Sequence, residues 1–250
     1  MIKTFLSLAR KVRVLYRVML GYELWVPCNS VTSLTWFGNP NYGGWKIPIS
    51  EIGIKVGVVD AGVGEDLSFS EDLIRRYQAN VVALDPTPKA AKFVKEKNNS
   101  SIDFLNHGLS SENGKAKFYM PTNENHVSGS LTSDDHLKGG EIEVELTNLS
   151  TAIQRLSTFD TLIVKMDIEG AEFDLLDSED FKKCAMVIDI LCIEFHHRWP
   201  QFGVQRLRKT VDKLKSLGFV CVWRHSETNE EFTFIRLMKR IHDKKLHPVT

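Results

Sequence analysis

The chain has 250 residues, of which 42% are hydrophobic and 26% are charged. It is long enough to bury a core in one large α/β domain or in two small domains. Lys plus Arg and Asp plus Glu number 32 each, so the formal net charge near neutral pH is zero. A general nucleic-acid binder usually carries a strong basic excess, so we expect no nucleic-acid partner.

The first twenty residues mix basic and apolar side chains, as an amphipathic helix does. The basic residues are Lys3, Arg10, Lys11, Arg13 and Arg17. The apolar stretches are too short for a membrane span, and no signal-peptide cleavage site follows them. Such a helix can lie on a membrane surface, but packing on its own domain or on a partner is the more common arrangement, and we expect packing.

Residues 21–50 are irregular and rich in aromatic side chains, with turn-forming residues at 39–44. Residues 1–50 are therefore predicted to form a helix followed by an aromatic cap. This cap either packs on the main domain or faces the substrate as a lid. We place the main domain at 51–240 and a basic tail at 241–250.

Four cysteines without a C-x-x-C pair indicate buried free thiols in a reducing compartment, and we expect a cytoplasmic protein.

From residue 56 on, short apolar runs alternate with helical patterns. The apolar runs predict strands at 56–59, 81–85, 102–105, 161–166, 186–195, 219–223 and 231–238. The helical patterns lie at 66–77, 89–97, 149–156, 204–217 and from 170 onward. Alternating side chains at 115–120 and 142–146 are typical of exposed or edge strands. The whole pattern predicts a mostly parallel sheet with helices on both faces and one antiparallel edge.

A glycine loop, Asp60–Gly64, ends the first of these strands and opens a helix, where backbone can approach a ligand closely. The third glycine of a dinucleotide fingerprint is missing, because Leu67 stands there. Glu65 and Asp66 would repel a pyrophosphate at the helix start. S-adenosylmethionine has a sulfonium cation, an ammonium group and a ribose, and lacks phosphate, so it fits better.

Asp85 ends the next strand, 25 residues after Asp60. An acid in this place commonly accepts hydrogen bonds from both ribose hydroxyls. The alternative is that Asp60 and Asp85 only cap the helices that follow them.

The segment Lys165–Glu172 follows a buried strand with two acids, Asp167 and Glu169. Ligands of parallel α/β sheets bind outside the carboxyl ends of the strands. Carboxylates at that edge therefore indicate a site that faces the cofactor or the acceptor.

Three segments, Val58–Gly64, Val82–Pro86 and Lys165–Glu172, resemble the FkbM family of S-adenosylmethionine-dependent methyltransferases. The resemblance covers roughly residues 52–238. It implies a class I methyltransferase, Rossmann-like fold with seven strands in the order 3-2-1-4-5-7-6, and mostly O-methylation of glycans or natural products. The family often has Asn after the alanine–glycine part of the loop, where Val63–Asp66 stands here.

The expected cofactor is S-adenosyl-L-methionine, and a backbone clamp for the adenine is expected at Asn106–Leu109. The expected cofactor-binding residues are Asp60, Gly62, Gly64, Glu65, Asp85, Pro86, Gly108, Asp167 and Glu169.

Four residues are candidates for the transfer chemistry: Asp167, Glu194, His196 and His197. Either histidine suits a general base that takes the proton of an acceptor hydroxyl. His196 is the better choice, because it shares a strand face with Glu194, its orienting partner. In the alternative interpretation the histidines have no catalytic part. Asp167, Glu194 and a histidine could together hold a metal, but no tight ligand spacing appears, so no metal is expected.

The sequence thus predicts a methyltransferase that acts on a hydroxyl of a glycan or small molecule. Two alternatives remain open: an NAD-dependent oxidoreductase, and a non-catalytic binding module with the same fold. The acceptor pocket cannot be inferred from the fold and the cofactor motif.

Overall fold

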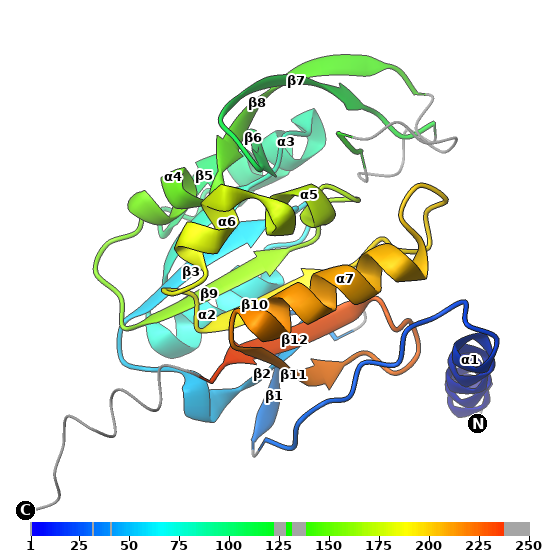
Figure 1. Cartoon of the computed structure of the whole chain (residues 1–250). Helices are drawn as coiled ribbons and strands as arrows, with labels where there is room; N and C mark the ends of the chain where they lie inside the picture. Colours follow the sequence, from blue (N-terminus) through cyan, green and yellow to red (C-terminus); the bar gives the residue numbers. More distant parts are fainter. Residues whose placement is uncertain (1, 32, 41, 123–128, 132–138, 238–250) are drawn as a thin grey trace, which may run out of the picture.

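The computed structural model describes residues 2–31, 33–40, 42–122, 129–131 and 139–237. Its centre is a seven-stranded sheet in the order β11-β12-β10-β9-β3-β4-β5 (Figure 1). The strands are β3 (Val56–Ala61), β4 (Asn80–Leu84), β5 (Ile102–Leu105), β9 (Thr161–Met166), β10 (Ile190–Glu194), β11 (Phe219–Arg224) and β12 (Glu231–Arg236). Counted along the chain, this is the expected order 3-2-1-4-5-7-6. In this sheet β12 runs antiparallel to β10 and β11, and every other pair of neighbouring strands is parallel.

Helices cover both faces of the sheet, because each central strand is apolar on both sides. In β9, Leu162 and Val164 pack into one core cluster and Ile163 into the other, as the alternation of a strand requires. The first cluster is covered by α4 (Leu149–Gln154), α5 (Glu172–Asp177), α6 (Glu179–Cys184) and α7 (Gly203–Ser216). The second is covered by α2 (Ser68–Tyr77) and α3 (Pro88–Lys97).

Two elements differ from the sequence-based prediction. The strand expected at 186–195 is only Ile190–Glu194, because 185–187 form a turn after α6 and leave Met186 and Val187 exposed. The helix expected from 170 onward is two short helices, α5 and α6, separated at Ser178, whose side chain caps α6.

The N-terminal region begins with α1 (Ile2–Met19) and continues to a hairpin of β1 (Leu34–Phe37) and β2 (Trp45–Pro48), which a 3-10 turn (Ile49–Glu51) follows. Phe37, Trp45 and Ile47 are buried in the second core cluster beside Phe69 of α2. The aromatic region therefore packs on the main sheet. Its loop also reaches the candidate site described below.

A second sheet stands over the carboxyl edge of the main sheet (Figure 1). It consists of β6 (His107–Ser110), β8 (Glu141–Asn148) and β7 (Gly114–Tyr119), in that order. The alternating runs at 115–120 and 142–146 are thus strands, but they pair with each other and with β6 in this separate sheet. The predicted tail at 241–250 lies outside the described residues.

Candidate active site

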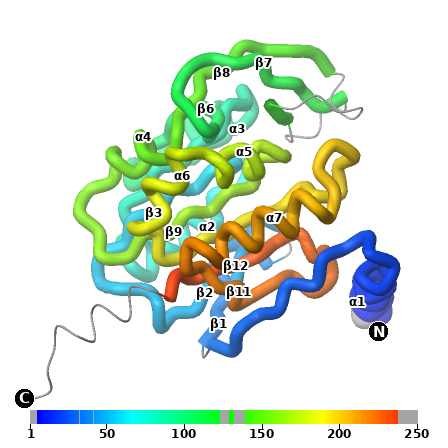
Figure 2. Tube along the Cα trace, in the orientation of Figure 1, coloured from blue at the N-terminus to red at the C-terminus, as the bar shows by residue number. Residues whose placement is uncertain are grey.

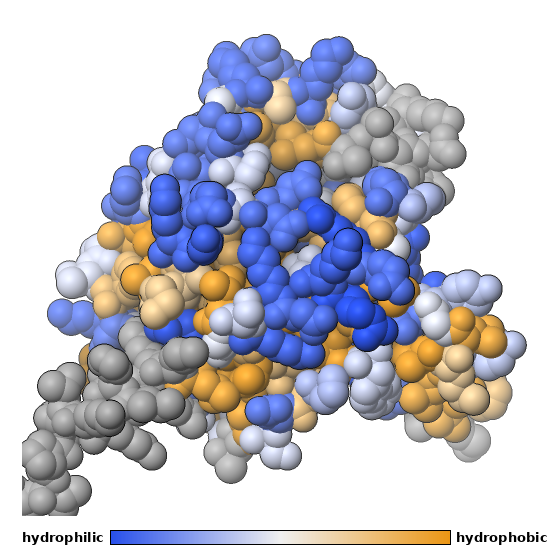
Figure 3. Space-filling model, viewed as in Figure 1, coloured by the Kyte–Doolittle hydropathy of each residue, from blue (hydrophilic) through white to orange (hydrophobic). Residues whose placement is uncertain are grey.

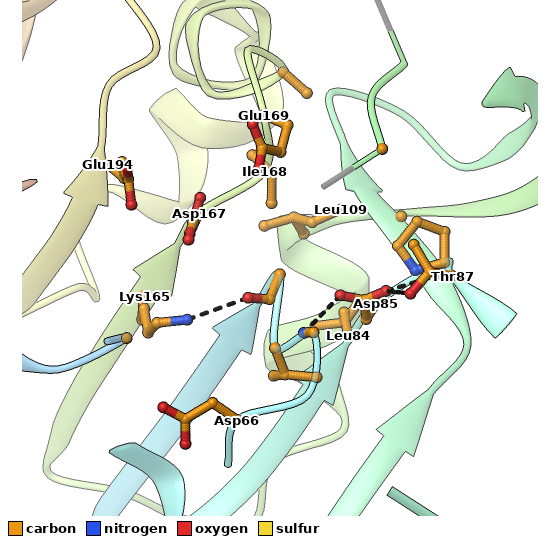
Figure 4. Close-up of a pocket in the computed structure, with 18 of the residues that line it drawn as sticks. Asp66, Leu84, Asp85, Thr87, Leu109, Lys165, Asp167, Ile168, Glu169 and Glu194 are labelled. Atoms are coloured by element: carbon orange, nitrogen blue, oxygen red, sulfur yellow. Dashed lines mark hydrogen bonds between the residues drawn. The ribbon is translucent and has the colours of Figure 1, made fainter. Parts of the chain in front are cut away.

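A cavity of about 320 Å³ lies between the carboxyl edge of the main sheet and the small sheet (Figure 4). Its lining is strongly acidic. Six carboxylate residues and one lysine line it, and the described lining holds no other charged side chain: Asp66, Asp85, Asp167, Glu169, Glu194, Glu231 and Lys165. The loop of the N-terminal hairpin contributes Tyr42 and Gly43, and β7 contributes Phe118.

Gly62 joins the two main motifs of the sequence. Its φ is +74°, and a Cβ added there would lie 1.7 Å from the carbonyl oxygen of Asp167. Its N–H donates to the carbonyl of Leu84 at 2.9 Å, and Asp167 N–H donates to the carbonyl of Ala61 at 3.1 Å. A side chain at Gly62 would therefore disturb the chain itself. The sequence predicts that Gly62 permits the close approach of a ligand; in the structure Gly62 also permits the close approach of the Asp167 backbone.

Asp85 lines the cavity with its carboxylate held by backbone and side-chain donors (Figure 4). Oδ2 accepts from Gly64 N–H at 2.9 Å, and Oδ1 accepts from the N–H and hydroxyl of Thr87 at 2.8 and 2.6 Å. Burial raises the pKa of Asp85 against the opposing hydrogen bonds from Thr87 and Gly64. Pro86 and Gly108, also expected at the cofactor, line the same part of the cavity.

Asp60 does not line the cavity, but it contacts Lys165, which does. Its carboxylate accepts from Lys165 Nζ at 2.9 Å and from the Ser70 hydroxyl at 2.7 Å. Burial lowers the pKa of Lys165, but Asp60 and Asp167 outweigh burial and hold that pKa above its usual value. The ammonium group therefore stays charged. Lys165 Nζ also lies 5.2 Å from the ring centroid of Trp45.

Asp167 and Glu194 extend from the ends of neighbouring strands toward the cavity (Figure 4). Burial raises the pKa of Asp167 to about 6, with His196 opposing the rise and Glu169 adding to it. Burial raises the pKa of Glu194 well above its usual value, and Asp167 raises it further. At neutral pH Asp167 is thus the more readily ionised of the two.

His196 lies among three carboxylates that follow β9: two from the loop after the strand and one from the first turn of α5. Nδ1 lies 3.2 Å from Glu172 Oε1, and Nε2 lies 3.0 Å from Glu169 Oε2 and 3.8 Å from Asp167 Oδ1. Burial lowers the pKa of His196, but Glu172 and Glu169 outweigh it and hold that pKa well above the usual histidine value. Both ring nitrogens of an imidazolium already carry a proton and cannot accept another, so this geometry does not suit the expected base. The orienting partner is Glu172, and not Glu194 as predicted.

Like Asp60 and His196, two further predicted site residues, His197 and Glu65, do not line the cavity. His197 is buried and places Nε2 2.8 Å from Glu23 Oε2, with Nδ1 3.0 Å from the carbonyl of Phe195. It supports the N-terminal segment. Glu65 is exposed and does not line the cavity. Both were placed by sequence distance alone, and sequence distance does not show which way a side chain points.

Ligand atoms of Asp167, Glu169 and His196 lie within 4.8 Å of one another. This set of oxygen and imidazole donors could hold a divalent ion. The carboxylate of Glu172 on Nδ1 is the kind of contact that fixes a metal-binding imidazole. The same groups also satisfy one another as ion pairs, so the geometry does not require an ion.

The site residues predicted from the sequence did not include Lys165, Glu172, Asp66 or Glu231, although Asp66 was used in the argument against a pyrophosphate. Lys165 could have been recognised from the sequence, because it is the one charged residue in a buried strand that is otherwise uncharged. Glu231 could also have been recognised, because an antiparallel strand begins at the edge of the sheet where the parallel strands end. Glu172 is fully buried and accepts from Gly170 and His196 N–H at 2.8 and 2.7 Å, which fixes the loop between them.

The strand order, with one antiparallel strand in the sixth position and a cavity at the carboxyl edge, defines the class I methyltransferase fold. A family model described as the methyltransferase FkbM domain matches residues 56–221. The chain belongs to this methyltransferase family. A comparison with curated proteins found no match.

Solved structures that are similar to the chain include a chain of a fibrillarin/Nop5p complex, a fibrillarin and a precorrin methyltransferase. A chain of the fibrillarin/Nop5p complex is 8% identical over 74% of this chain and 73% of its own, with a TM-score of 0.42. The Methanococcus jannaschii fibrillarin, a pre-rRNA processing protein, is 12% identical over 84% and 86%, with a TM-score of 0.43. The precorrin-6y C5,15-methyltransferase from Geobacter metallireducens GS-15 is 11% identical over 76% and 85%, with a TM-score of 0.38.

Proposed function

We propose that the chain transfers a methyl group from S-adenosyl-L-methionine to a hydroxyl oxygen of a glycan or small-molecule acceptor. The observation that carries this proposal is the charge of the cavity. Six carboxylate residues line it, and its one described lysine is already paired with Asp60. Such a lining favours a cationic ligand and disfavours the two phosphates of NAD.

The residues present fit this cofactor at three places. Gly64 and Asp85 stand at the ends of β3 and β4, where the fold binds a nucleoside and its ribose. Asp66 Oδ2 is buried and has no hydrogen-bond partner among the described residues, while Oδ1 accepts from Ser68 N–H at 2.8 Å. An unpaired buried carboxylate oxygen is costly, and an ammonium group would satisfy it. Gly108 and Leu109 offer backbone and apolar surface for an adenine.

When bound, S-adenosylmethionine supplies an electrophilic methyl group on its sulfonium. This chain's residues must then hold the acceptor hydroxyl in line and receive its proton. Asp167 is the proposed base. It lines the cavity, and the cationic groups of Lys165 and His196 favour its ionised form.

Glu194 and His196 have supporting parts in this proposal. Glu194, with its strongly raised pKa, can donate a hydrogen bond to the acceptor from its protonated form. His196 acts as a positioning residue, because its ring holds Asp167 and Glu169 in place and is not itself among the residues that line the cavity.

The test compares S-adenosylhomocysteine with NAD as ligands in a thermal-shift assay of the purified chain. S-adenosylhomocysteine should raise the melting temperature and NAD should not. The reverse result would favour an oxidoreductase. Binding without methyl transfer to any of a broad panel of hydroxylated acceptors would favour the non-catalytic binding module.

A further inference from the structure

The N-terminal helix α1 is attached to the body of the protein through its polar face. Ser7 Oγ donates to Glu227 Oε1 at 2.5 Å, and Arg10 Nη1 pairs with Glu227 Oε2 at 3.2 Å. One turn further on, Val14 is buried. Arg17 Nε then pairs with the buried Glu23 at 3.2 Å. These residues recur every three or four positions and therefore share one side of the helix.

The opposite side of α1 is apolar and faces away from the protein. Its exposed residues are Phe5, Leu8, Val12, Leu15, Tyr16 and Met19. Phe5 is 73% exposed and Met19 is 84% exposed. Helices of globular proteins turn their apolar stripe toward the core and their polar face toward water. In α1 this arrangement is reversed.

The reversal is visible on the surface of the molecule. In Figure 1 and Figure 2, α1 stands at the periphery, away from the helices that cover the sheet. Figure 3 shows a hydrophobic patch in the same place. Leu20, Tyr22 and Trp25 extend the exposed apolar surface just beyond the helix. A contiguous patch of this kind marks an interaction surface.

The charge around the stripe indicates what it binds. Residues 1–20 contain no Asp or Glu, but they contain five basic residues. An α-helix turns by about 100° around its axis for each residue, and this rotation places Lys11 and Arg13 on the two borders of the apolar stripe. Both are exposed, and within the described part of the chain neither forms an ion pair.

We infer that α1 binds flat on an anionic lipid surface, with its apolar stripe in the acyl boundary and its basic borders at the headgroups. Basic, amphipathic helices bind membranes in this way, and Tyr and Trp favour the interface. A second copy of the chain fits less well, because its α1 has no acid to pair with Lys11 and Arg13. No described helix is long and apolar enough to cross a bilayer. The sequence predicts that this helix packs on its own domain or on a partner; in the structure it packs on its own domain only through the side that carries Ser7, Arg10, Val14 and Arg17.

The test is co-sedimentation of the full chain with vesicles. Wild-type protein should pellet with phosphatidylcholine vesicles that contain phosphatidylserine, and not with pure phosphatidylcholine. The double variant Leu8→Glu/Leu15→Glu should lose at least about tenfold in binding. Ile54→Glu is the matched control, because Ile54 is 89% exposed, apolar and far from α1 in sequence, and it should bind as wild type does.

A second variant keeps the test decisive if the apolar variant does not fold. Lys11→Glu/Arg13→Glu changes two exposed side chains that form no ion pair within the described residues, and it should also lose binding to the anionic vesicles. Wild-type protein that does not pellet with the vesicles containing phosphatidylserine would overturn the inference. So would a dimer, measured by light scattering without lipid, that Leu8→Glu/Leu15→Glu converts to a monomer while vesicle binding is absent.

Discussion

At the scale of single residues, Asp85 is the sharpest test of the cofactor position. Its carboxylate lines the cavity and is held by Gly64 and Thr87. We expect Asp85→Ala to weaken S-adenosylhomocysteine binding by about 1.5–3 kcal/mol, the cost of a lost hydrogen bond to a charged group. Calorimetry measures this affinity. Thr87→Val is the control, because it removes a bond to the same carboxylate and should change stability more than affinity.

Gly62 tests how the glycine loop and the Asp167 loop fit together. Gly62→Ala places a Cβ 1.7 Å from the carbonyl of Asp167. Gly21 has nearly the same φ, +76° against +74°, but nothing lies within 4 Å of its Cβ position. We expect Gly21→Ala to cost about 1–2 kcal/mol of unfolding free energy from backbone conformation alone, and Gly62→Ala to cost clearly more. Equal losses in urea unfolding would show that the contact does not matter.

Asp167 tests the proposed base. Asp167→Asn should lower kcat by about 10²–10⁴-fold with little change in cofactor affinity, because it removes the proton acceptor and keeps the shape.

In wild type the rate should fall as the pH drops through about 6, where Asp167 gains its proton. His196→Gln removes a neighbouring positive charge, so it should raise the pKa of Asp167 and move this acid limb to higher pH. A pH–rate profile left unchanged by His196→Gln would argue against this arrangement. Activity lost with EDTA and restored by a divalent ion would show that an ion takes part.

At the scale of elements, Glu23 holds the N-terminal segment to the body. Its carboxylate is buried and pairs with Arg198, His197 and Asn229 at 2.7–2.8 Å. Burial raises the pKa of Glu23, but the hydrogen bonds from His197, Asn229 and Arg198 outweigh burial and lower it to about 2. A lowered pKa stabilises the folded state above the unfolded value of 4.5, and this stabilisation is lost as the pH falls from there toward about 2.

We therefore expect Glu23→Gln to lower the free energy of unfolding by about 3 kcal/mol near neutral pH, since one pKa unit corresponds to about 1.4 kcal/mol. The difference between variant and wild type should shrink as the solution is acidified. Urea unfolding at a series of pH values measures it. A difference that stays constant with pH would show that the charge of Glu23 is not what stabilises the segment.

The sequence predicted the elements of the main sheet closely, because each central strand is a short apolar run between helical patterns. It did not predict which sheet 115–120 and 142–146 would join. Their alternating side chains fit any half-exposed strand, and pairing is decided by contacts far apart in the chain. It also missed the break at Ser178, since the apolar spacing continues through it.

At the scale of the whole molecule, the strand order followed from the resemblance to the family, and the position of the cavity followed from the motifs. The glycine loop, Asp85 and Asp167 lie at strand ends, and parallel strands bring their carboxyl ends to one edge. The directions of individual side chains did not follow. His196 and His197 are adjacent in sequence, yet one contacts Asp167 and Glu169 and the other contacts Glu23. The outward direction of the apolar stripe of α1 could not be predicted either, because periodicity shows that a helix has two faces but does not show which face packs.

The central claim is that the acidic cavity binds S-adenosylmethionine, and calorimetric titration tests it most directly. S-adenosylhomocysteine should bind at one site per chain, Asp85→Ala should weaken that binding, and NAD should give no heat of binding. A chain that binds NAD and not S-adenosylhomocysteine, or binding that Asp85→Ala leaves unchanged, would contradict the account.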